Sequence, residues 1–208
     1  MKKPETVILK EEGFISKGNH RACYHYPGRP DKCIKVILSE DGKRICAFEF
    51  KYIKILYGRG FDPKTIPHYY GTVPVNIGVD HVGYVYDIVE NSDGSQAKCL
   101  HDFFVDEELF RKNEKTLLEL MEKLRQDLYD NQVIFRSLTT PNILFPVDSE
   151  GHMDVKLIND LGTRAVLKFN YHFGWAAHRY VNKYWAKFKR DIPKHYNQPW
   201  VLEFAKKI

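Results

Sequence analysis

The stretch FRSLTTPNILF, residues 135–145, places a short polar segment directly before an apolar run. Arg136 opens the segment, Ser137 follows it, and Asn142 stands five residues after the serine. The run Ile143-Leu144-Phe145 has the composition of a buried strand. The stretch therefore predicts a polar loop at the entrance of a strand, and the rest of the chain decides what that loop does.

The composition of the 208-residue chain is that of a folded protein. Hydrophobic residues make up 43% and charged residues 28%, which is ordinary for one domain or two small lobes. No run approaches the roughly 18 apolar residues of a membrane span, and the N-terminus lacks a signal-peptide core. Four cysteines occur without zinc-site spacing: Cys23, Cys33, Cys46 and Cys99. We therefore expect a cytoplasmic protein with free thiols and no transmembrane segment.

The net charge of +5 comes with a basic segment at residues 175–190. Such a segment suits an anionic partner, which could be a nucleotide, a membrane surface or a nucleic acid. A solvated helix face has the same pattern and is the alternative. Because the chain has no nucleic-acid-binding motif, we do not expect nucleic acid as a partner.

Hydrophobic periodicity gives a strand-rich first half and a helix-rich second half. Short β-prone runs broken by glycine and proline lie at residues 7–9, 14–15, 21–26, 33–38 and 82–89. Helical spacing predicts helices over 41–57, 107–130 and near 173–190. Turn residues 148–151 predict a hairpin between strands at 143–147 and 155–158. Residues 67–72 have the composition of a turn-rich segment.

Several residues in the first half have the types that phosphate binding requires. Phosphoryl transfer needs backbone donors over the phosphates, a lysine on their oxygens and a carboxylate that orients the lysine. Gly18 lies in a turn between two β-prone runs, with Arg21 at the third glycine position of a G-x-G-x-x-G pattern. Lys35 lies inside an apolar run, and Glu49 lies on the helix at 41–57. Each has an alternative interpretation: Gly18 could lie in a plain hairpin turn, Lys35 could face solvent, and Glu49 could lie on the surface.

The second half contains candidate metal ligands. Asn142 follows Ser137 by the separation of Asp and Asn in the kinase loop H-R-D-L-x-x-x-N, whose Asn binds a metal. Asp160-Leu161-Gly162 follows a strand-like run and is similar to D-F-G, whose Asp binds Mg²⁺. The alternative for Asp160 is an ordinary turn residue.

The phosphate-binding candidates of the first half and the metal-ligand candidates of the second half occur in protein-kinase order. A hinge-like turn after Val89 and a long helix lie between them. This order predicts ATP and Mg²⁺ as ligands. Lys35 would hold the α- and β-phosphates, Asn142 and Asp160 would hold the metal, and the backbone near Val89 would meet adenine. The predicted site residues are Gly18, Arg21, Lys35, Glu49, Val89, Glu90, Asn91, Ser137, Asn142 and Asp160.

We therefore expect an α+β chain with a reduced, bilobal, protein-kinase-like fold. Residues 1–90 would form an antiparallel β lobe with one helix. Residues 91–208 would form a small, mostly helical lobe. Only 46 residues follow Gly162, and no A-P-E signature is present, so a small phosphoacceptor is favoured over a peptide.

The chain resembles the YrbL family, the PhoP-regulatory-network proteins of Gram-negative bacteria, which have a protein-kinase-like pattern. The resemblance is carried by residues 18–36, 49–56, 70–89, 130–144 and 159–162. It implies that a serine at the catalytic-Asp position is a family trait, in an S-L-K-P-x-N frame. This chain departs from that frame with Thr139 in place of lysine. The family name reflects regulation of expression and implies no activity.

Ser137 leaves two functions open. A serine hydroxyl is no general base near neutral pH, and general acid–base help is worth about 10²–10⁴-fold. The chain is therefore expected to be either an atypical, slow phosphotransferase or a pseudokinase that acts as a regulatory module with an unknown small-molecule or protein partner. Asp127 and Asp130 lie upstream and are poorly placed to replace the base.

Overall fold

The chain forms two compact units in its structure, a computed structural model that describes residues 5–159, 161–162 and 173–208. The first unit comprises Met1–Lys51 and Pro67–Ile88, and the second unit comprises Tyr52–Ile66 and Val89–Ile208. The expected boundary at residue 90 lies next to the break after Ile88. Residues 52–66, however, belong with the second unit and not with the first.

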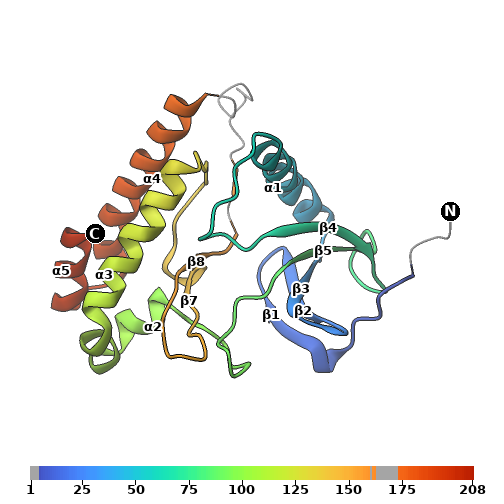
Figure 1. Cartoon of the computed structure of the whole chain (residues 1–208), viewed down its shortest axis with the longest axis horizontal. Helices are drawn as coiled ribbons and strands as arrows, with labels where there is room; N and C mark the ends of the chain where they lie inside the picture. Colours follow the sequence, from blue (N-terminus) through green and yellow to red (C-terminus); the bar gives the residue numbers. More distant parts are fainter. Residues whose placement is uncertain (1–4, 160, 163–172) are drawn as a thin grey trace. The chain divides into compact units, whose positions relative to one another are not determined.

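The first unit is built on an antiparallel sheet with the strand order β1-β2-β3-β5-β4 (Figure 1). Helix α1, Glu40–Gly58, lies between β3 and β4 in the chain, and its first twelve residues belong to this unit. A short 3-10 turn, Glu11–Gly13, precedes the sheet. The strands are β1 Phe14–Lys17, β2 Arg21–Tyr26, β3 Arg29–Ile37, β4 Tyr69–Pro74 and β5 Val82–Asp87.

The central strand β3 is buried on both faces of the sheet. Side chains alternate between the faces of a strand, so Ile34 and Val36 point to one face and Cys33 and Lys35 to the other. On the first face, an apolar cluster contains Leu9, Ala22, Ile34, Val36, Val75 and Val85. The second face packs against α1, where the Phe50 ring stacks on Tyr84 with centroids 3.7 Å apart. The lysine predicted for phosphate binding therefore lies on the helix-covered face.

The second unit consists mainly of helices, with a small antiparallel sheet of order β6-β7-β8. Asp106 caps α3 by accepting a 2.9 Å hydrogen bond from the Leu109 backbone amide. In Figure 1, α3 and α4 run alongside one another, and they pack together with α5. The elements are β6 Lys98–Cys99, α2 Leu100–Val105, α3 Glu107–Asp130, η2 Thr140–Asn142, β7 Ile143–Phe145, β8 Lys156–Leu157, α4 Gly174–His195 and α5 Pro199–Lys207.

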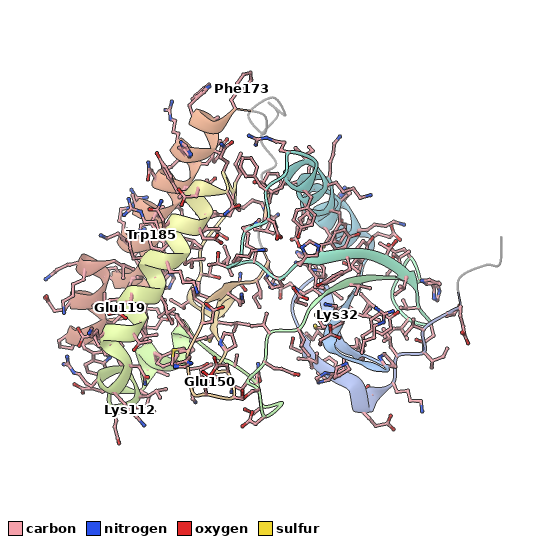
Figure 2. The ribbon with its side chains drawn as sticks, in the orientation of Figure 1. Lys32, Lys112, Glu119, Glu150, Phe173 and Trp185 are labelled. Carbon is pink, nitrogen blue, oxygen red and sulfur yellow. The ribbon has the colours of Figure 1, made fainter. Side chains whose placement is uncertain are left out.

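The core of the second unit comes from the apolar stripes of its helices. The predicted stripe of α3 is fully buried through Leu117, Met121, Leu124 and Leu128. On α4 the buried residues include Trp185, which Figure 2 labels on that helix. Rings from α2, α3 and α5 pack edge to face: each of Phe104, Phe110 and Phe204 contacts the other two. Among the described helices, none is both long enough and apolar enough to cross a membrane.

The structure confirms an α+β chain with antiparallel sheets and several helices, and it corrects three local predictions. Residues 67–72 are not a turn: β4 pairs with β5, and Gly71, with φ 111°, allows a bulge in it. Residues 7–9 form only an isolated bridge between Val7 and Val75, and the Asn76 side chain bonds both the amide and the carbonyl of Leu9. The last helix continues to His195, and α5 follows it unpredicted.

Candidate functional site

Glu49 and Arg21 form a buried ion pair in the first unit. Arg21 Nη1 lies 2.8 Å from Glu49 Oε1, and Arg21 Nη2 lies 3.2 Å from Glu49 Oε2. The Glu49 side chain is 3% exposed and that of Arg21 is 13% exposed. Burial alone would lower the pKa of Arg21, but the adjacent carboxylate outweighs it, so that pKa is raised. The pair joins the first residue of β2 to α1.

Lys35 lies on the same face of the sheet as this pair. Its strand neighbours are Cys23 in β2 and Tyr84 in β5. The Lys35 ammonium lies 4.9 Å from the centre of the Tyr86 ring. The Tyr86 hydroxyl donates a 3.4 Å hydrogen bond to Glu49 Oε1, and burial followed by the Glu49 charge raises the pKa of Tyr86. Tyr86 therefore contacts both the lysine and the carboxylate that the sequence predicted to act together.

The turn that contains Gly18 is closed by a backbone hydrogen bond. The Gly18 amide donates to the Arg21 carbonyl over 2.8 Å, between the end of β1 and the start of β2. A side chain at Gly18 would make only an ordinary 3.9 Å contact, to that same carbonyl. Steric crowding in the described structure therefore does not require a glycine here.

The predicted hinge residues lie at the start of the long second segment of the second unit, after β5. Glu90 forms an isolated bridge with Gln96. The Asn91 amide donates to the Ser95 carbonyl over 2.9 Å, and the Asn91 side-chain oxygen accepts from the Val147 amide over 2.9 Å. Asn91 thus holds a tight loop in place. Val89, the third of these residues, opens the segment at the boundary between the two units.

The loop with Ser137 and Asn142 lies beside the segment that carries the DLG motif, within the second unit. Asn159 Nδ2 donates to Asn142 Oδ1 over 3.4 Å, and the Ile158 amide donates to the Asn142 carbonyl over 2.9 Å. Phe135 forms a bridge with Leu161, and the Gly162 amide donates to the Ile134 carbonyl over 2.7 Å. Asp160 itself lies outside the described residues.

Backbone conformation around that segment is unusual for ordinary residues. Asn159 has φ 68° and Gly162 has φ 75°, both in the left-handed region. Asparagine and glycine are the residues that tolerate this region best. Gly162 therefore has a backbone conformation that a sharp turn can use. Asn159 is a neighbour of Asn142 that periodicity could not indicate, because the contact spans 17 positions.

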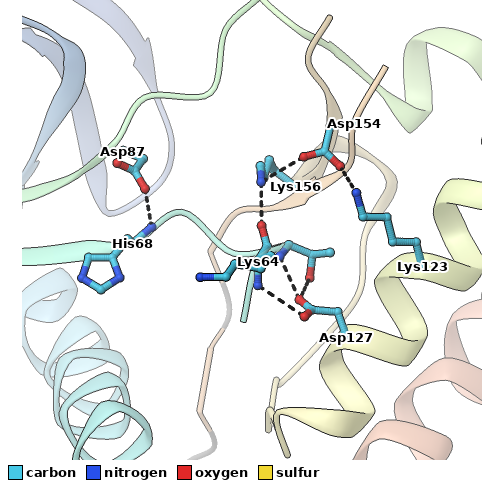
Figure 3. Close-up of polar contacts among 8 residues, drawn as sticks. Lys64, His68, Asp87, Lys123, Asp127, Asp154 and Lys156 are labelled. Carbon is cyan, nitrogen blue, oxygen red and sulfur yellow. Dashed lines mark hydrogen bonds and ion pairs between the residues drawn. The ribbon is translucent and has the colours of Figure 1, made fainter. Parts of the chain in front are cut away.

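Asp127 has a structural role in the second unit, as Figure 3 shows. Its Oδ2 accepts hydrogen bonds from the Thr65 amide, over 2.8 Å, and from the Thr65 hydroxyl, over 2.6 Å. Nearby, Lys156 donates to the Lys64 carbonyl and pairs with Asp154, which also pairs with Lys123. A carboxylate occupied in this way anchors residues 64–65 to α3 and does not serve as a replacement base.

The predicted metal ligands, Asn142 and Asp160, are oxygen donors. Among the described residues, no three histidine, cysteine or acidic side chains gather as a metal site. The proposed ligand set is of a different kind, one amide oxygen from Asn142 and one carboxylate from Asp160. Amide and carboxylate oxygens are ligands that Mg²⁺ accepts together with water and phosphate.

Comparison with known proteins identifies the family. Residues 7–193 match the family model described as PhoP regulatory network protein YrbL. Uncharacterized YrbL proteins of Escherichia coli (strain K12) and Shigella flexneri are each 29% identical to this chain over 184 residues. These alignments cover 88% of this chain and 86% of each relative. The chain therefore belongs to the PhoP regulatory network protein YrbL family.

Proposed function

We propose that the protein binds Mg·ATP in a kinase-like manner and acts as an atypical phosphotransferase without the usual catalytic Asp. The observation that carries this proposal is the buried carboxylate of Glu49 on the face of the sheet that holds Lys35. A buried carboxylate costs free energy unless it is paired. Arg21 pairs with Glu49, and Tyr86 contacts both that carboxylate and the Lys35 ammonium. In kinases, a helix glutamate of this kind positions the lysine that binds the α- and β-phosphates.

Each unit has its own part in the proposed reaction. In the first unit, Lys35 meets phosphate oxygens, and the Arg21–Glu49 pair holds α1 against β2. In the second unit, Asn142 and Asp160 would hold Mg²⁺. Bound Mg²⁺ would neutralise charge on the phosphates. Ser137 can accept and relay a hydrogen bond at the position of the base but cannot remove a proton near neutral pH.

Nucleotide binding is tested by thermal unfolding with ATP and Mg²⁺. At 100 times Kd, a ligand stabilises the folded state by about 2.7 kcal/mol, so the Tm of the wild type should rise. Lys35→Met should remove the rise, because it deletes the phosphate-binding charge and keeps the length of the side chain. Lys43→Met is the matched control, since Lys43 is exposed on α1, and it should keep the rise. An unchanged Tm of the wild type with ATP or ADP would exclude the proposal.

Transfer is tested separately by ATP turnover with Mg²⁺. We expect slow turnover in the wild type and none in Asp160→Ala. Ser137→Asp restores a carboxylate at the position of the base and should raise turnover by about 10²-fold or more. If Ser137→Asp leaves turnover unchanged while ATP still binds, loss of the base does not limit the reaction.

A regulatory module without transfer is the second candidate. Two residues of the loop favour it, because Ser137 supplies no base and the exposed Thr139 supplies no positive charge. This candidate predicts a nucleotide-dependent rise in Tm together with no turnover in either the wild type or Ser137→Asp. The two measurements therefore separate a phosphotransferase from a nucleotide-binding pseudokinase.

A further inference from the structure

Two free thiols lie on neighbouring strands of the first unit, on the face that carries Lys35. In the antiparallel register of β2 and β3, Cys23 is opposite Lys35, and Cys33 is opposite His25. The two cysteines are therefore diagonal neighbours on one face of the sheet. Their side chains meet, because hydrogen bonding joins the two thiols.

The two thiols differ in exposure and in pKa. Cys23 is half-buried, whereas Cys33 is 4% exposed. Hydrogen bonding from Cys33, followed by the positive charges of Lys35 and Arg21, outweighs burial and lowers the pKa of Cys23 to about 7. Hydrogen bonding to Cys23 and burial raise the pKa of Cys33, and its sulfur lies 3.6 Å from the Asp87 carbonyl oxygen. Cys23 is thus the accessible thiol of the pair and Cys33 its sheltered neighbour.

We propose that Cys23 and Cys33 are a redox-sensitive pair that a peroxide converts into an intramolecular disulfide. The Cys23 thiolate attacks one peroxide oxygen, the O–O bond breaks, and water leaves after protonation of the second oxygen. The Cys33 sulfur then attacks the resulting Cys23 sulfenic acid, the S–O bond breaks, and a second water leaves. Two thiols and one hydrogen peroxide molecule give one disulfide and two waters, so hydrogen peroxide takes both electrons.

Strand geometry permits this closure with a small movement. Diagonal neighbours in a regular ladder lie about 7–8 Å apart, which is beyond the roughly 6.8 Å limit for the Cα atoms of a disulfide, so the two strands must approach by about 1 Å. A bulge between His25 and Tyr26 interrupts the register directly after the His25–Cys33 pair and bends β2 locally beside Cys33. Closure also removes the thiolate charge opposite Lys35. The proposal goes beyond nucleotide binding and does not depend on it.

The other two cysteines are less suited to react first. Cys46 is 3% exposed on α1. Cys99 lies in the second unit, and burial raises its pKa. A thiol reacts with peroxide as its thiolate, so a raised pKa slows the reaction. Order of oxidation therefore distinguishes the proposed pair from general thiol damage.

The test is peptide mapping of the reduced full chain after exposure to hydrogen peroxide. Remaining thiols are blocked with iodoacetamide, and the protein is digested with trypsin without reductant. Trypsin cuts after Arg21, Lys32 and Lys35 but not between Arg29 and Pro30, so Cys23 and Cys33 fall in separate peptides, 22–32 and 33–35. We expect these two peptides to appear linked, at a mass lower by two hydrogen atoms than their sum, and to separate with dithiothreitol.

Single variants test the order of the two steps. In Cys33→Ser, the Cys23 sulfenic acid should persist and be trapped by dimedone. In Cys23→Ser, the same peroxide dose should give no dimedone adduct at Cys33. Cys46→Ser is the matched control and should form the 22–32 to 33–35 link as the wild type does.

Three outcomes of the wild-type experiment would overturn the proposal. The first is a link from peptide 22–32 to peptide 45–51, which contains Cys46. The second is oxidation of Cys99 before Cys23. The third is reduced Cys23 at a peroxide dose that fully oxidises free cysteine in the same tube. None of these outcomes requires a variant to fold.

Discussion

The Arg21 guanidinium meets both carboxylate oxygens of Glu49 inside the first unit. A bidentate arginine pair has strong directional hydrogen bonds. Such a pair adds little net stability when compared with apolar residues of the same size. Removing only one of the two residues is costly, however, because the charge of the other residue stays buried without a partner. Arg21 is therefore a positioning residue, and its loss should destabilise the protein by leaving the Glu49 carboxylate without this partner.

Arg21→Ala should destabilise the protein by roughly 3–5 kcal/mol, the cost of breaking a buried pair from one side. Urea unfolding monitored by fluorescence measures this change. Arg44→Ala is the matched control, because the Arg44–Asp41 pair is exposed on α1, and it should stay within about 0.5 kcal/mol of the wild type.

The double variant Arg21→Met with Glu49→Leu refines this prediction. Replacing both charges by apolar groups removes the uncompensated charge, so the double variant should be more stable than Arg21→Ala. A loss below about 1 kcal/mol in Arg21→Ala, or a double variant less stable than the single one, would contradict the assigned role.

Asp87 makes the stability of the first unit depend on pH. Burial alone would raise the pKa of Asp87, but hydrogen bonds from Lys32, the His68 amide and Tyr70 outweigh burial and lower it. Two of these bonds are 2.8 Å and 3.0 Å long, from Lys32 Nζ and the His68 amide (Figure 3 shows the latter). A carboxylate with a lowered pKa contributes stability above its unfolded pKa, and this contribution is lost as the pH falls through its folded pKa.

Asp87→Asn should therefore reduce the free energy of unfolding most at neutral pH. The difference from the wild type should shrink below about pH 4, where the unfolded carboxyl group begins to bind its proton. Urea unfolding from pH 7 to pH 3 measures the difference. A constant difference over that range would show that the charge of Asp87 plays no part. Asp41→Asn, on the exposed part of α1, serves as the surface control.

At the scale of elements, β5 passes so close to the apolar cluster that one position accepts no side chain. A methyl group at Gly83 would lie 2.6 Å from Ile34 Cγ2 and 2.7 Å from Val75 Cγ1. Contacts that short force neighbouring side chains or strands to move. Gly83 is therefore required by packing, and its φ is not in the left-handed region.

Gly83→Ala should destabilise the protein by about 1–3 kcal/mol, the usual cost of overpacking. Gly58→Ala is the matched control, because a methyl group at the end of α1 meets nothing within 4 Å. It should be neutral or stabilising by up to about 1 kcal/mol. Thermal unfolding of the two variants beside the wild type makes the comparison, and equal Tm values would contradict the packing argument.

Elements with long periodic patterns were predictable, and short ones were not. The stripes of α1 and α3 repeat over several turns, so their bounds were expected within one or two residues. Strand β4 was not expected, because its Gly71 and Pro74 are typical of turns and its identity depends on pairing with β5. Helices α2 and α5 have fewer than ten residues each and therefore too few turns for a clear pattern.

For the whole molecule, residues 52–66 make hydrogen bonds that the second unit needs in order to fold. The Tyr52 hydroxyl accepts a 2.6 Å hydrogen bond from the Ile134 amide and donates one to the Gln132 carbonyl. Thr65 is fully buried, bonds to Asp127, and accepts from the Leu157 amide over 2.7 Å. A chain cut at the expected boundary of residue 90 removes all of these contacts from the second unit.

A fragment of residues 91–208 should therefore lack a cooperative urea transition when produced alone. Co-expression with residues 1–90 supplies Tyr52 and Thr65 again and should give a complex that copurifies and unfolds cooperatively. Circular dichroism during urea unfolding measures both samples. A transition of the isolated fragment at the urea concentration of the full chain would show that residues 52–66 are dispensable.

Local periodicity and residue type were enough to predict most of the elements, their order and the candidate residues. The sequence by itself placed Lys35 on a buried strand, Glu49 on a helix and Asn142 before a strand. Only the tertiary structure decided which residues meet. Packing of α1 on the sheet paired Arg21 with Glu49, strand register brought Cys23 to Cys33, and contacts distant in sequence joined Thr65 to Asp127. The chain has many cations and four cysteines, and no local pattern encodes the helix packing and strand pairing that bring particular ones together.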